Sequence, residues 1–287
     1  MKVLITGKNG QLGCELQNTA PAGMELFVFG SSELDITDQQ AVQQLVQKIQ
    51  PNIVINAAAY TAVDKAESDS DAAYAVNAKG PEYLALACKE IGARLIQVST
   101  DFVFDANKNT PYQVSDTTNP MGVYGASKLA GEHAIKQFYP DNSVIIRTSW
   151  VYSASGNNFV KTMLRLMAEK PELGIVSDQL GSPTWAKGLA SACWGFAQNN
   201  QLGIHHYSDL GVASWYDFAV GIQDLAIEKG LLQSAINIKP IKAAAYPTPA
   251  KRPPYSVMDT DNTYKALGIE GKHWRIALNE MLDELKA

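Results

Sequence analysis

Short apolar segments alternate with longer amphipathic ones along the first half of the chain. Strand-like apolar runs lie at residues 3–5, 24–29, 52–56, 94–98 and 143–147. Helical patterns lie between them, at about residues 38–50, 72–91 and 122–138. Near-continuous apolar strands separated by helices are typical of a parallel sheet that is covered on both faces. The pattern therefore predicts an α/β fold with a doubly wound parallel sheet.

The alternation loosens after about residue 150. Helical patterns at 157–169, 184–198 and 214–228 are separated by short strands such as 203–207. Four prolines between residues 243 and 254 exclude a regular helix there. We predict two domains: residues 1–150 hold the sheet, and residues 151–287 form a smaller substrate domain that is partly interleaved with the first.

Composition and charge narrow the class of protein. The chain has 24 Lys and Arg against 29 Asp and Glu, so its net charge of −5 does not indicate a nucleic-acid-binding surface. The three cysteines are far apart and odd in number, which fits a reducing compartment. The four histidines lack the spacing of metal ligands. No signal peptide and no stretch of about 20 apolar residues is present. We expect a cytoplasmic protein without a membrane segment.

A glycine-rich turn directly follows the first predicted strand and opens the first helix. Its sequence is Gly7-Lys8-Asn9-Gly10-Gln11-Leu12-Gly13. Glycines at such a turn let the backbone approach a dinucleotide pyrophosphate, which then meets the N-terminus of the helix. A tight turn without a ligand is the alternative, and the strand–helix–strand context favours the nucleotide and a Rossmann-type sheet. The spacing Gly-x2-Gly-x2-Gly resembles that of extended short-chain dehydrogenases/reductases.

A tyrosine and a lysine of the kind used by that family occur at Tyr124 and Lys128. Such a pair also arises by chance, but here it lies on a predicted helix whose i,i+4 spacing puts both side chains on one face. A phenol with a pKa of about 10 is a poor acid–base group near pH 7 unless a cation stabilises its phenolate. A hydroxyl from Ser99 or Thr100, at the end of the fourth strand, would hold the substrate oxygen, and the residues alone leave both open.

Seven longer sequence segments indicate which family within this superfamily the chain resembles. They are AAAYTAVDKAE at 57–67, STDFVF at 99–104, VYG at 123–125, RTSWVY at 147–152, GNNF at 156–159, DQLGSPT at 178–184 and YPTPAKRP at 246–253. Together they resemble the dTDP-4-dehydrorhamnose reductases, from the first strand to the last helix. The resemblance implies hydride transfer from NADPH or NADH to C4 of a sugar nucleotide, dTDP-4-dehydro-L-rhamnose, which yields dTDP-L-rhamnose.

The resemblance also implies roles for individual residues. Tyr124 would donate the proton, Lys128 would assist it, and Thr100 rather than Ser99 would orient the carbonyl oxygen. The implied cofactor-binding residues are Gly7, Gly10, Gln11, Leu12, Gly13, Asp35, Ile36, Ala57, Ala58, Ala59, Tyr60, Thr61, Tyr124 and Lys128. The implied substrate-binding residues are Thr100, Asp101, Trp150, Asn158 and Arg252. Trp194, Trp215 and Trp274 are instead expected to pack in the core.

The chain departs from the family's pattern at two places. Many members carry an acidic residue for the adenosine ribose at the end of the second strand, where this chain has Gly30-Ser31-Ser32. Some members dimerise through magnesium held by acidic side chains, which makes a homodimer one expectation. Glu15 and Glu284 match two of those positions, but the third is Lys187. We therefore predict no metal site and leave the choice between NADPH and NADH open.

Two other functions share much of this pattern. A sugar-nucleotide epimerase of the same superfamily would keep the glycine turn, Tyr124 and Lys128. A non-catalytic regulatory subunit that binds NADP would keep the fold, but the presence of Tyr124, Lys128 and Thr100 argues against it. The strings at 147–150 and 246–253 favour the reductase through family resemblance alone.

Overall fold

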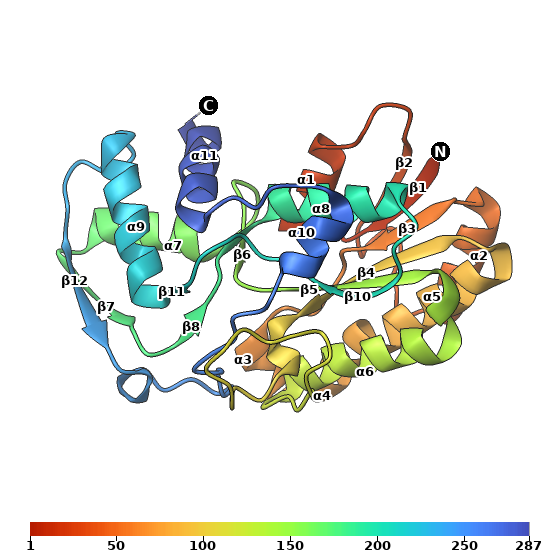
Figure 1. Ribbon diagram of the computed structural model, residues 1–287, viewed down its shortest axis with the longest axis horizontal. Coiled ribbons are helices and arrows are strands. Elements are labelled where there is room, and N and C mark those ends of the chain that lie inside the picture. The colour runs from red at the N-terminus through yellow and green to blue at the C-terminus, as the bar shows by residue number, and fades with distance from the viewer. Residues whose placement is uncertain (287) are drawn as a thin grey trace.

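The structure is a computed structural model that describes residues 1–286. Its centre is a six-stranded parallel sheet (Figure 1). In spatial order the strands are β2 (Glu25–Phe29), β1 (Lys2–Thr6), β3 (Ile53–Asn56), β4 (Arg94–Thr100), β5 (Ser143–Thr148) and β10 (Gly203–His206). The strand order reverses between β1 and β3, and ligands of such sheets bind outside the carboxyl ends of the strands at that point. The predicted doubly wound parallel sheet is confirmed.

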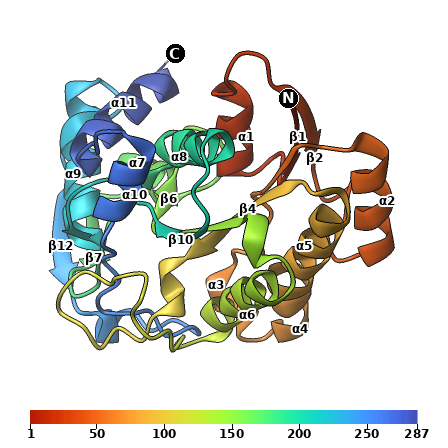
Figure 2. The ribbon, with the colours of Figure 1, turned by 45° about the vertical axis from the view of Figure 1, so that its right-hand side comes forward.

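Helices cover both faces of the sheet (Figures 1 and 2). The helices α1 (Gln11–Asn18), α8 (Ala186–Gln198) and α10 (Asp261–Leu267) pack on one face, and α2 (Gln39–Ile49), α5 (Gly80–Ile91) and α6 (Val123–Phe138) pack on the other. Successive strand residues alternate between the two cores, with Val3 and Ile5 in the first and Leu4 in the second. Because both faces are buried, apolar residues occupy the middle of β1, β3, β4 and β5, while polar residues lie toward their carboxyl ends.

The helix expected at 72–91 is divided into separate pieces. These are α4 (Ser70–Tyr74), a π-helical turn over Ala75–Lys79, and α5. Pro81 lacks the N–H that an α-helix would direct at the carbonyl of Asn77, which explains the wider turn. The Asn77 side chain accepts from the backbone N–H of Tyr60 at 2.9 Å and donates to the Ser127 hydroxyl at 3.1 Å. The π-helical turn thus ties the loop after β3 to helix α6.

A second body lies beside the sheet and has a core of its own. The helices α7 (Phe159–Glu169), α9 (Trp215–Glu228) and α11 (Trp274–Lys286) pack there with the parallel strands β7 (Glu172–Val176) and β12 (Asn237–Ile241). Two short pairs join the bodies: β6 (Val151–Tyr152) with β9 (Thr184–Trp185), and β8 (Leu180–Gly181) with β11 (Ala213–Ser214). Segments 186–206 and 261–267 return to the sheet. The division at residue 150 stays a prediction.

The remaining helical elements are short. Helix α3 (Val63–Ala66) follows β3, and 3₁₀ turns cover Asp101–Val103, Pro140–Asn142 and Ala243–Ala245. The last of these is the one helical turn within 243–254, in agreement with the prolines of that segment. Among residues 1–286, no helix combines the length and apolar character needed to span a membrane.

Candidate active site

A cavity of about 840 Å³ opens at the carboxyl ends of β1, β3, β4 and β5, between the sheet and the second body. This volume lies within the range of small-molecule and cofactor sites. Most of the residues expected at the site line it: Gly7, Gly10, Gln11, Leu12, Asp35, Ile36, Ala57, Ala58, Ala59, Tyr60, Thr61, Thr100, Asp101, Tyr124, Lys128, Trp150 and Arg252. Residues from widely separated parts of the chain therefore meet at the switch point of the sheet.

The glycine turn is shaped so that larger residues do not fit. Gly7 has φ +75°, and a Cβ atom on it would lie 2.7 Å from the backbone of Ala57. A Cβ atom on Gly13 would lie 2.1 Å from the carbonyl oxygen of Gly7. Gly10 precedes helix α1 without a side-chain cap, so the helix presents its first turn to the cavity. A phosphate group fits such an uncapped helix start.

Unpaired polar atoms also mark the cavity as a site for a polar ligand. Asp101 Oδ2 and Thr148 Oγ1 are buried and have no hydrogen-bond partner among the described residues, and both residues line the cavity. Buried polar atoms are nearly always paired, so unpaired ones beside a cavity favour a ligand that supplies the partner. Together with the glycine turn, these atoms fit a dinucleotide and a polar second substrate.

The end of β2 differs from what the sequence suggested. Gly30, Ser31 and Ser32 carry no acid, but the structure folds Glu33 back so that its Oε2 accepts the Gly30 N–H at 2.8 Å. Glu33 Oε1 also accepts from Lys8 Nζ at 3.0 Å. The hydrogen bonds from Gly30 and Lys8 lower the pKa of Glu33. A carboxylate and an ammonium thus stand together at the expected ribose position.

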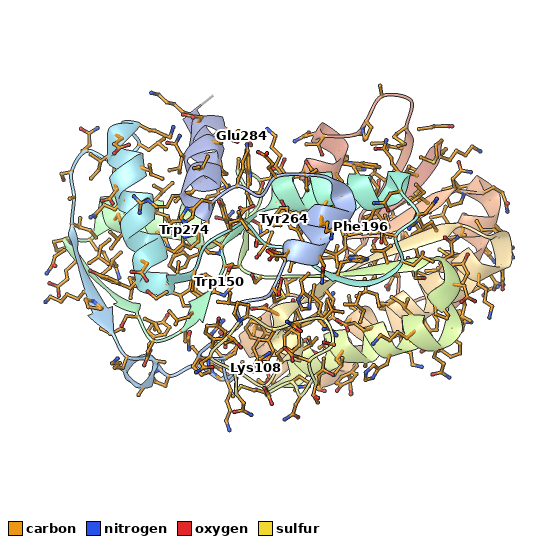
Figure 3. All side chains as sticks on the ribbon, in the orientation of Figure 1. Lys108, Trp150, Phe196, Tyr264, Trp274 and Glu284 are labelled. Atoms are coloured by element: carbon orange, nitrogen blue, oxygen red, sulfur yellow. The ribbon has the colours of Figure 1, made fainter. Side chains whose placement is uncertain are left out.

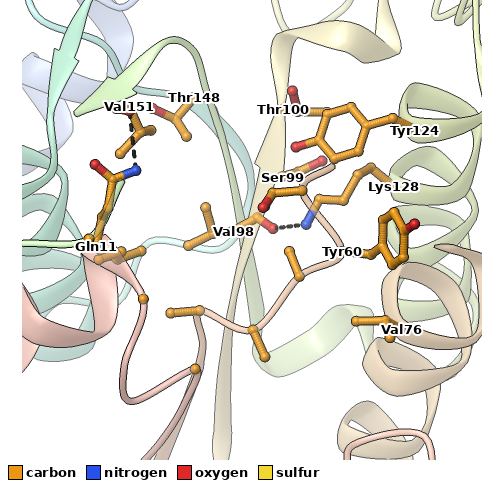
Figure 4. Close-up of a pocket in the computed structure, with 18 of the residues that line it drawn as sticks. Gln11, Tyr60, Val76, Val98, Ser99, Thr100, Tyr124, Lys128, Thr148 and Val151 are labelled. Carbon is orange, nitrogen blue, oxygen red and sulfur yellow. Dashed lines mark hydrogen bonds between the residues drawn. The ribbon is translucent and has the colours of Figure 1, made fainter. Parts of the chain in front are cut away.

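Tyr124 and Thr100 lie side by side at the cavity wall (Figure 4). Burial raises the pKa of Tyr124 to about 12, the Thr100 hydroxyl opposes this shift, and the Asp101 carboxylate adds to it. Tyr124 is therefore a neutral phenol that can donate a proton near pH 7. Lys128 is not among the groups that shift this pKa, so the effect expected of its charge on the phenolate stays a prediction.

Lys128 lies one helical turn after Tyr124, as expected from the spacing. Its Nζ donates to the carbonyl oxygen of Val98 at 2.6 Å and lies at the cavity wall (Figure 4). Burial lowers the pKa of Lys128 to about 8, and Glu132 acts in the opposite direction. Lys128 is thus mostly charged at neutral pH and loses its charge just above it.

Asp101 is a buried acid that adjoins Thr100. Its Oδ1 accepts from the Thr100 hydroxyl at 3.0 Å. Burial raises the pKa of Asp101 to about 6. The Ser256 and Thr100 hydroxyls oppose this effect of burial. Asp101 Oδ2 has no hydrogen-bond partner among the described residues and can accept from a ligand hydroxyl.

Trp150 lies near the middle of the molecule (Figure 3) with its ring stacked on Trp215, 3.5 Å between ring centroids and 5° between planes. Trp150 has φ +47°, a left-handed conformation that is strained for a bulky residue. A Cβ atom on Gly181 would lie 2.6 Å from the Trp150 ring, so close packing holds the ring in place. Trp215 packs against the core of the second body as a partly buried residue, and it also lines the cavity, which the sequence analysis did not expect. Trp194 and Trp274 do lie buried in the cores.

Arg252 enters the cavity from the proline-rich segment. Its Nη2 forms an ion pair with Asp64 Oδ2 at 2.8 Å, and Asp64 Oδ1 accepts the Ala250 N–H at 3.3 Å. Asp64 therefore holds both this segment and its guanidinium at the cavity rim. The sequence string 57–67 contained Asp64, but no local pattern indicated a partner so far along the chain.

Comparison with known proteins decides the family. Residues 1–287 match the protein family described as RmlD substrate binding domain. A curated relative from Aggregatibacter actinomycetemcomitans, named dTDP-4-dehydrorhamnose reductase, is 40% identical over 288 residues, which cover 98% of each chain. The chain belongs to this family of dTDP-4-dehydrorhamnose reductases.

Solved structures agree with this membership. A dTDP-4-dehydrorhamnose reductase from Clostridium acetobutylicum has a TM-score of 0.94 at 40% identity and covers 100% of both chains. The dTDP-4-dehydrorhamnose reductase from Bacillus anthracis, solved in complex with NADP, has a TM-score of 0.93 at 37% identity and covers 99% of both chains. The predicted family, the oxidoreductase class and a nicotinamide cofactor are confirmed at the level of the family. The roles of individual residues stay predictions.

Two residues implied by the resemblance do not line the cavity. Gly13 packs beneath the glycine turn, where it allows the close approach to Gly7. Asn158 caps helix α7, with its Oδ1 accepting the Lys161 N–H at 3.1 Å. Its Nδ2 donates to Gln11 Oε1 at 2.9 Å. Asn158 therefore reaches the glycine turn through Gln11.

A lysine, Lys187, lies between the two acidic residues that match the expected magnesium-ligand positions, Glu15 and Glu284. Lys187 Nζ forms an ion pair with Glu284 Oε1 at 2.7 Å, and the buried Glu15 accepts from the Ser153 hydroxyl at 2.7 Å. Within residues 1–286, no group of three or more His, Cys, Asp or Glu residues could hold a metal ion. An ammonium group repels a divalent cation, so these residues do not fit magnesium. Both the absence of a metal and the homodimer stay predictions.

Proposed function

We propose that the protein reduces the C4 keto group of dTDP-4-dehydro-L-rhamnose to dTDP-L-rhamnose with NADPH or NADH. The observation that carries this proposal is the meeting of Tyr124, Thr100 and Lys128 at the wall of a cavity that the glycine turn also lines. The full-length match to dTDP-4-dehydrorhamnose reductases supplies the substrate class.

The cofactor would lie across the carboxyl ends of the strands. Gly7, Gly10 and the first turn of α1 would hold its pyrophosphate, Asp35 and Ile36 its adenosine half, and the Ala57–Ala59 segment the part nearer β3. Lys128 would bind the nicotinamide ribose hydroxyls. When bound, the reduced nicotinamide supplies a hydride.

The proton would come from Tyr124. Reduction of a ketone leaves charge on its oxygen, so the site needs a neutral acid within hydrogen-bond reach. Burial keeps the Tyr124 phenol protonated, and Thr100 next to it would hold the carbonyl oxygen. Once Tyr124 has given up its proton, the charged Lys128 one turn away would stabilise the phenolate.

The sugar nucleotide would occupy the side of the cavity formed by the second body. Trp150, fixed by Trp215 and Gly181, offers a rigid surface for the sugar, and Asp101 Oδ2 an acceptor for a hydroxyl. Arg252 suits the diphosphate because a guanidinium pairs well with phosphate oxygens. Its ion pair with Asp64 would hold it in position before the substrate arrives.

An epimerase and a reductase differ in whether the reduced cofactor is consumed. An epimerase returns its hydride, whereas a reductase consumes one reduced cofactor for each product. The test follows the absorbance of NADPH and, separately, NADH with purified protein and the 4-keto sugar nucleotide. We expect one cofactor oxidised per sugar nucleotide; an epimerised product without net oxidation overturns the proposal. A bound cofactor without turnover would instead favour the regulatory subunit.

A further inference from the structure

A row of buried polar side chains crosses the sheet directly beneath the candidate active site. Ser99 on β4 pairs in register with Arg147 on β5, and Arg147 pairs with His206 on β10. All three are buried, and Arg147 is the one buried arginine of the sheet. The row lies next to Thr100, since Ser99 precedes it on the same strand.

Glu132 on helix α6 binds two members of this row. Its carboxylate accepts from Arg147 Nε at 2.9 Å and Nη2 at 2.7 Å, and from the Ser99 hydroxyl at 2.6 Å. The exposed fractions of the Glu132 and Arg147 side chains are 0% and 2%. A buried ion pair seldom stabilises a fold more than apolar residues of the same volume would, so stability alone does not explain this pair.

The helix places Glu132 in line with the two candidate catalytic residues. Tyr124, Lys128 and Glu132 follow one another at intervals of four and so share one face of α6. Lys128 and Glu132 are thus neighbours on that face, with Val98 and Ser99 of β4 bonded to them in turn. The carboxylate is bonded directly to Arg147 and Ser99, and Lys128 lies one helical turn before it.

Other ionisable groups also face Lys128 or its surroundings. Tyr124 and Asp101 lie at the cavity wall, and Tyr60 reaches it from the loop after β3 but donates its hydroxyl to Asp69 at 3.0 Å. Arg147 extends away under the Phe104 ring, 5.1 Å from its centroid. Burial lowers the pKa of Lys128, and Glu132 is the charged group that opposes this effect.

We propose that Glu132 is a positioning residue for the reaction: Arg147 and Ser99 hold its carboxylate one helical turn after Lys128, where its negative charge favours the ammonium form of Lys128 beside Thr100 and Tyr124. This inference rests on the proposed function for the role of Lys128. It assigns the buried Glu132–Arg147 pair to catalysis, because a neutral Lys128 could not stabilise the phenolate of Tyr124.

The test compares pH profiles of wild type, Glu132→Gln and Glu132→Asp. Wild-type turnover should fall as pH rises through about 8, where Lys128 loses its proton. In Glu132→Gln this basic limb should move down by about one pH unit, because the negative charge that opposes the effect of burial on Lys128 is removed. Glu132→Asp keeps the charge, so its limb should stay near that of wild type. A folded Glu132→Gln variant with an unmoved limb overturns the inference.

A second variant guards against misfolding, since Glu132→Gln leaves Arg147 buried and unpaired. The double variant Glu132→Gln/Arg147→Met removes both charges and should recover the urea midpoint lost by the single variant. Its basic limb should nevertheless remain below that of wild type. A purely structural pair predicts the opposite, namely that the profile recovers together with the stability.

A binding measurement separates this inference from the proposed function. The dissociation constant of NADPH, followed by fluorescence between pH 6 and 10, reports the charge of Lys128 without any sugar nucleotide. Weakening that begins at a lower pH in Glu132→Gln supports the inference even if the reductase assay fails. Identical curves for both proteins contradict it even if that assay succeeds.

Discussion

The Tyr124 hydroxyl is the single group to which the mechanism assigns the proton. In Tyr124→Phe the ring keeps its edge-to-face packing on Phe102, but the donor is lost. We expect turnover to fall by ~10²–10⁴-fold while NADPH binding is largely kept. Tyr139→Phe, at the other end of the same helix and outside the cavity, is the matched control and should retain turnover. Near-normal turnover of Tyr124→Phe would show that another group donates the proton.

We expect the ion pair of Lys8 and Glu33 to set the preference between NADPH and NADH. A carboxylate near the ribose favours the 2′-hydroxyl of NADH, whereas an ammonium favours the 2′-phosphate of NADPH. Because both charges are present and paired, we expect NADPH to be used at least as well as NADH, with a preference of about tenfold or less. Glu33→Gln should shift the ratio of kcat/KM values toward NADPH, and Gly30→Asp toward NADH. A strong native preference for NADH contradicts this account.

At the scale of elements, the turn between β1 and α1 depends on Gly13. A methyl group there would overlap the Gly7 carbonyl oxygen, so Gly13→Ala must displace either the helix or the turn. We expect the dissociation constant of NADPH to rise by about tenfold or more, together with a lower urea midpoint. Asn18→Ala, at the exposed end of the same helix, tests the specificity and should change neither quantity. An unchanged affinity in Gly13→Ala would mean that the turn does not hold the pyrophosphate.

The sequence predicted those strands and helices whose residues carry a clear local pattern of apolar and polar positions. The apolar runs at 52–56 and 143–147 became β3 and β5 because both faces of each strand are buried. The π-helical turn at 75–79 did not follow, since its cause is the proline two residues later acting on one carbonyl. The periodic pattern of apolar residues extends over the whole helix, so it does not reveal the loss of a single hydrogen bond.

The candidate site shows the same division. Gly7, Tyr124 and Lys128 carry short motifs whose spacing is set within one turn or helix, and all line the cavity. No local motif predicted the contributions of Trp215 and Asp64, because their partners Trp150 and Arg252 are distant in the chain. The hydrogen bond between Glu33 and the Gly30 N–H depends on the conformation of the loop after β2, which the residue types alone did not predict.

At the scale of the whole molecule, we expect Lys187 to exclude magnesium. Its ion pair with Glu284 joins helices α8 and α11 where the family would need a third acid. We expect chelation by EDTA to leave turnover and the mass in solution unchanged. Lys187→Glu should gain a melting temperature that rises with magnesium, because three carboxylates would then face one another. Loss of assembly on chelation of the wild-type protein contradicts this prediction.

In the proposed reaction, one hydride reaches C4 of the sugar while Tyr124 supplies the proton to its oxygen. The most direct measurement is to incubate the protein and the 4-keto sugar nucleotide with NADPH carrying deuterium at C4 of the nicotinamide, each of the two stereoisomers separately. We expect one stereoisomer to place deuterium at C4 of dTDP-L-rhamnose, seen by NMR as loss of the H4 signal, and the other to leave that signal intact. Deuterium at another carbon, or a product without deuterium from either stereoisomer, would contradict the account.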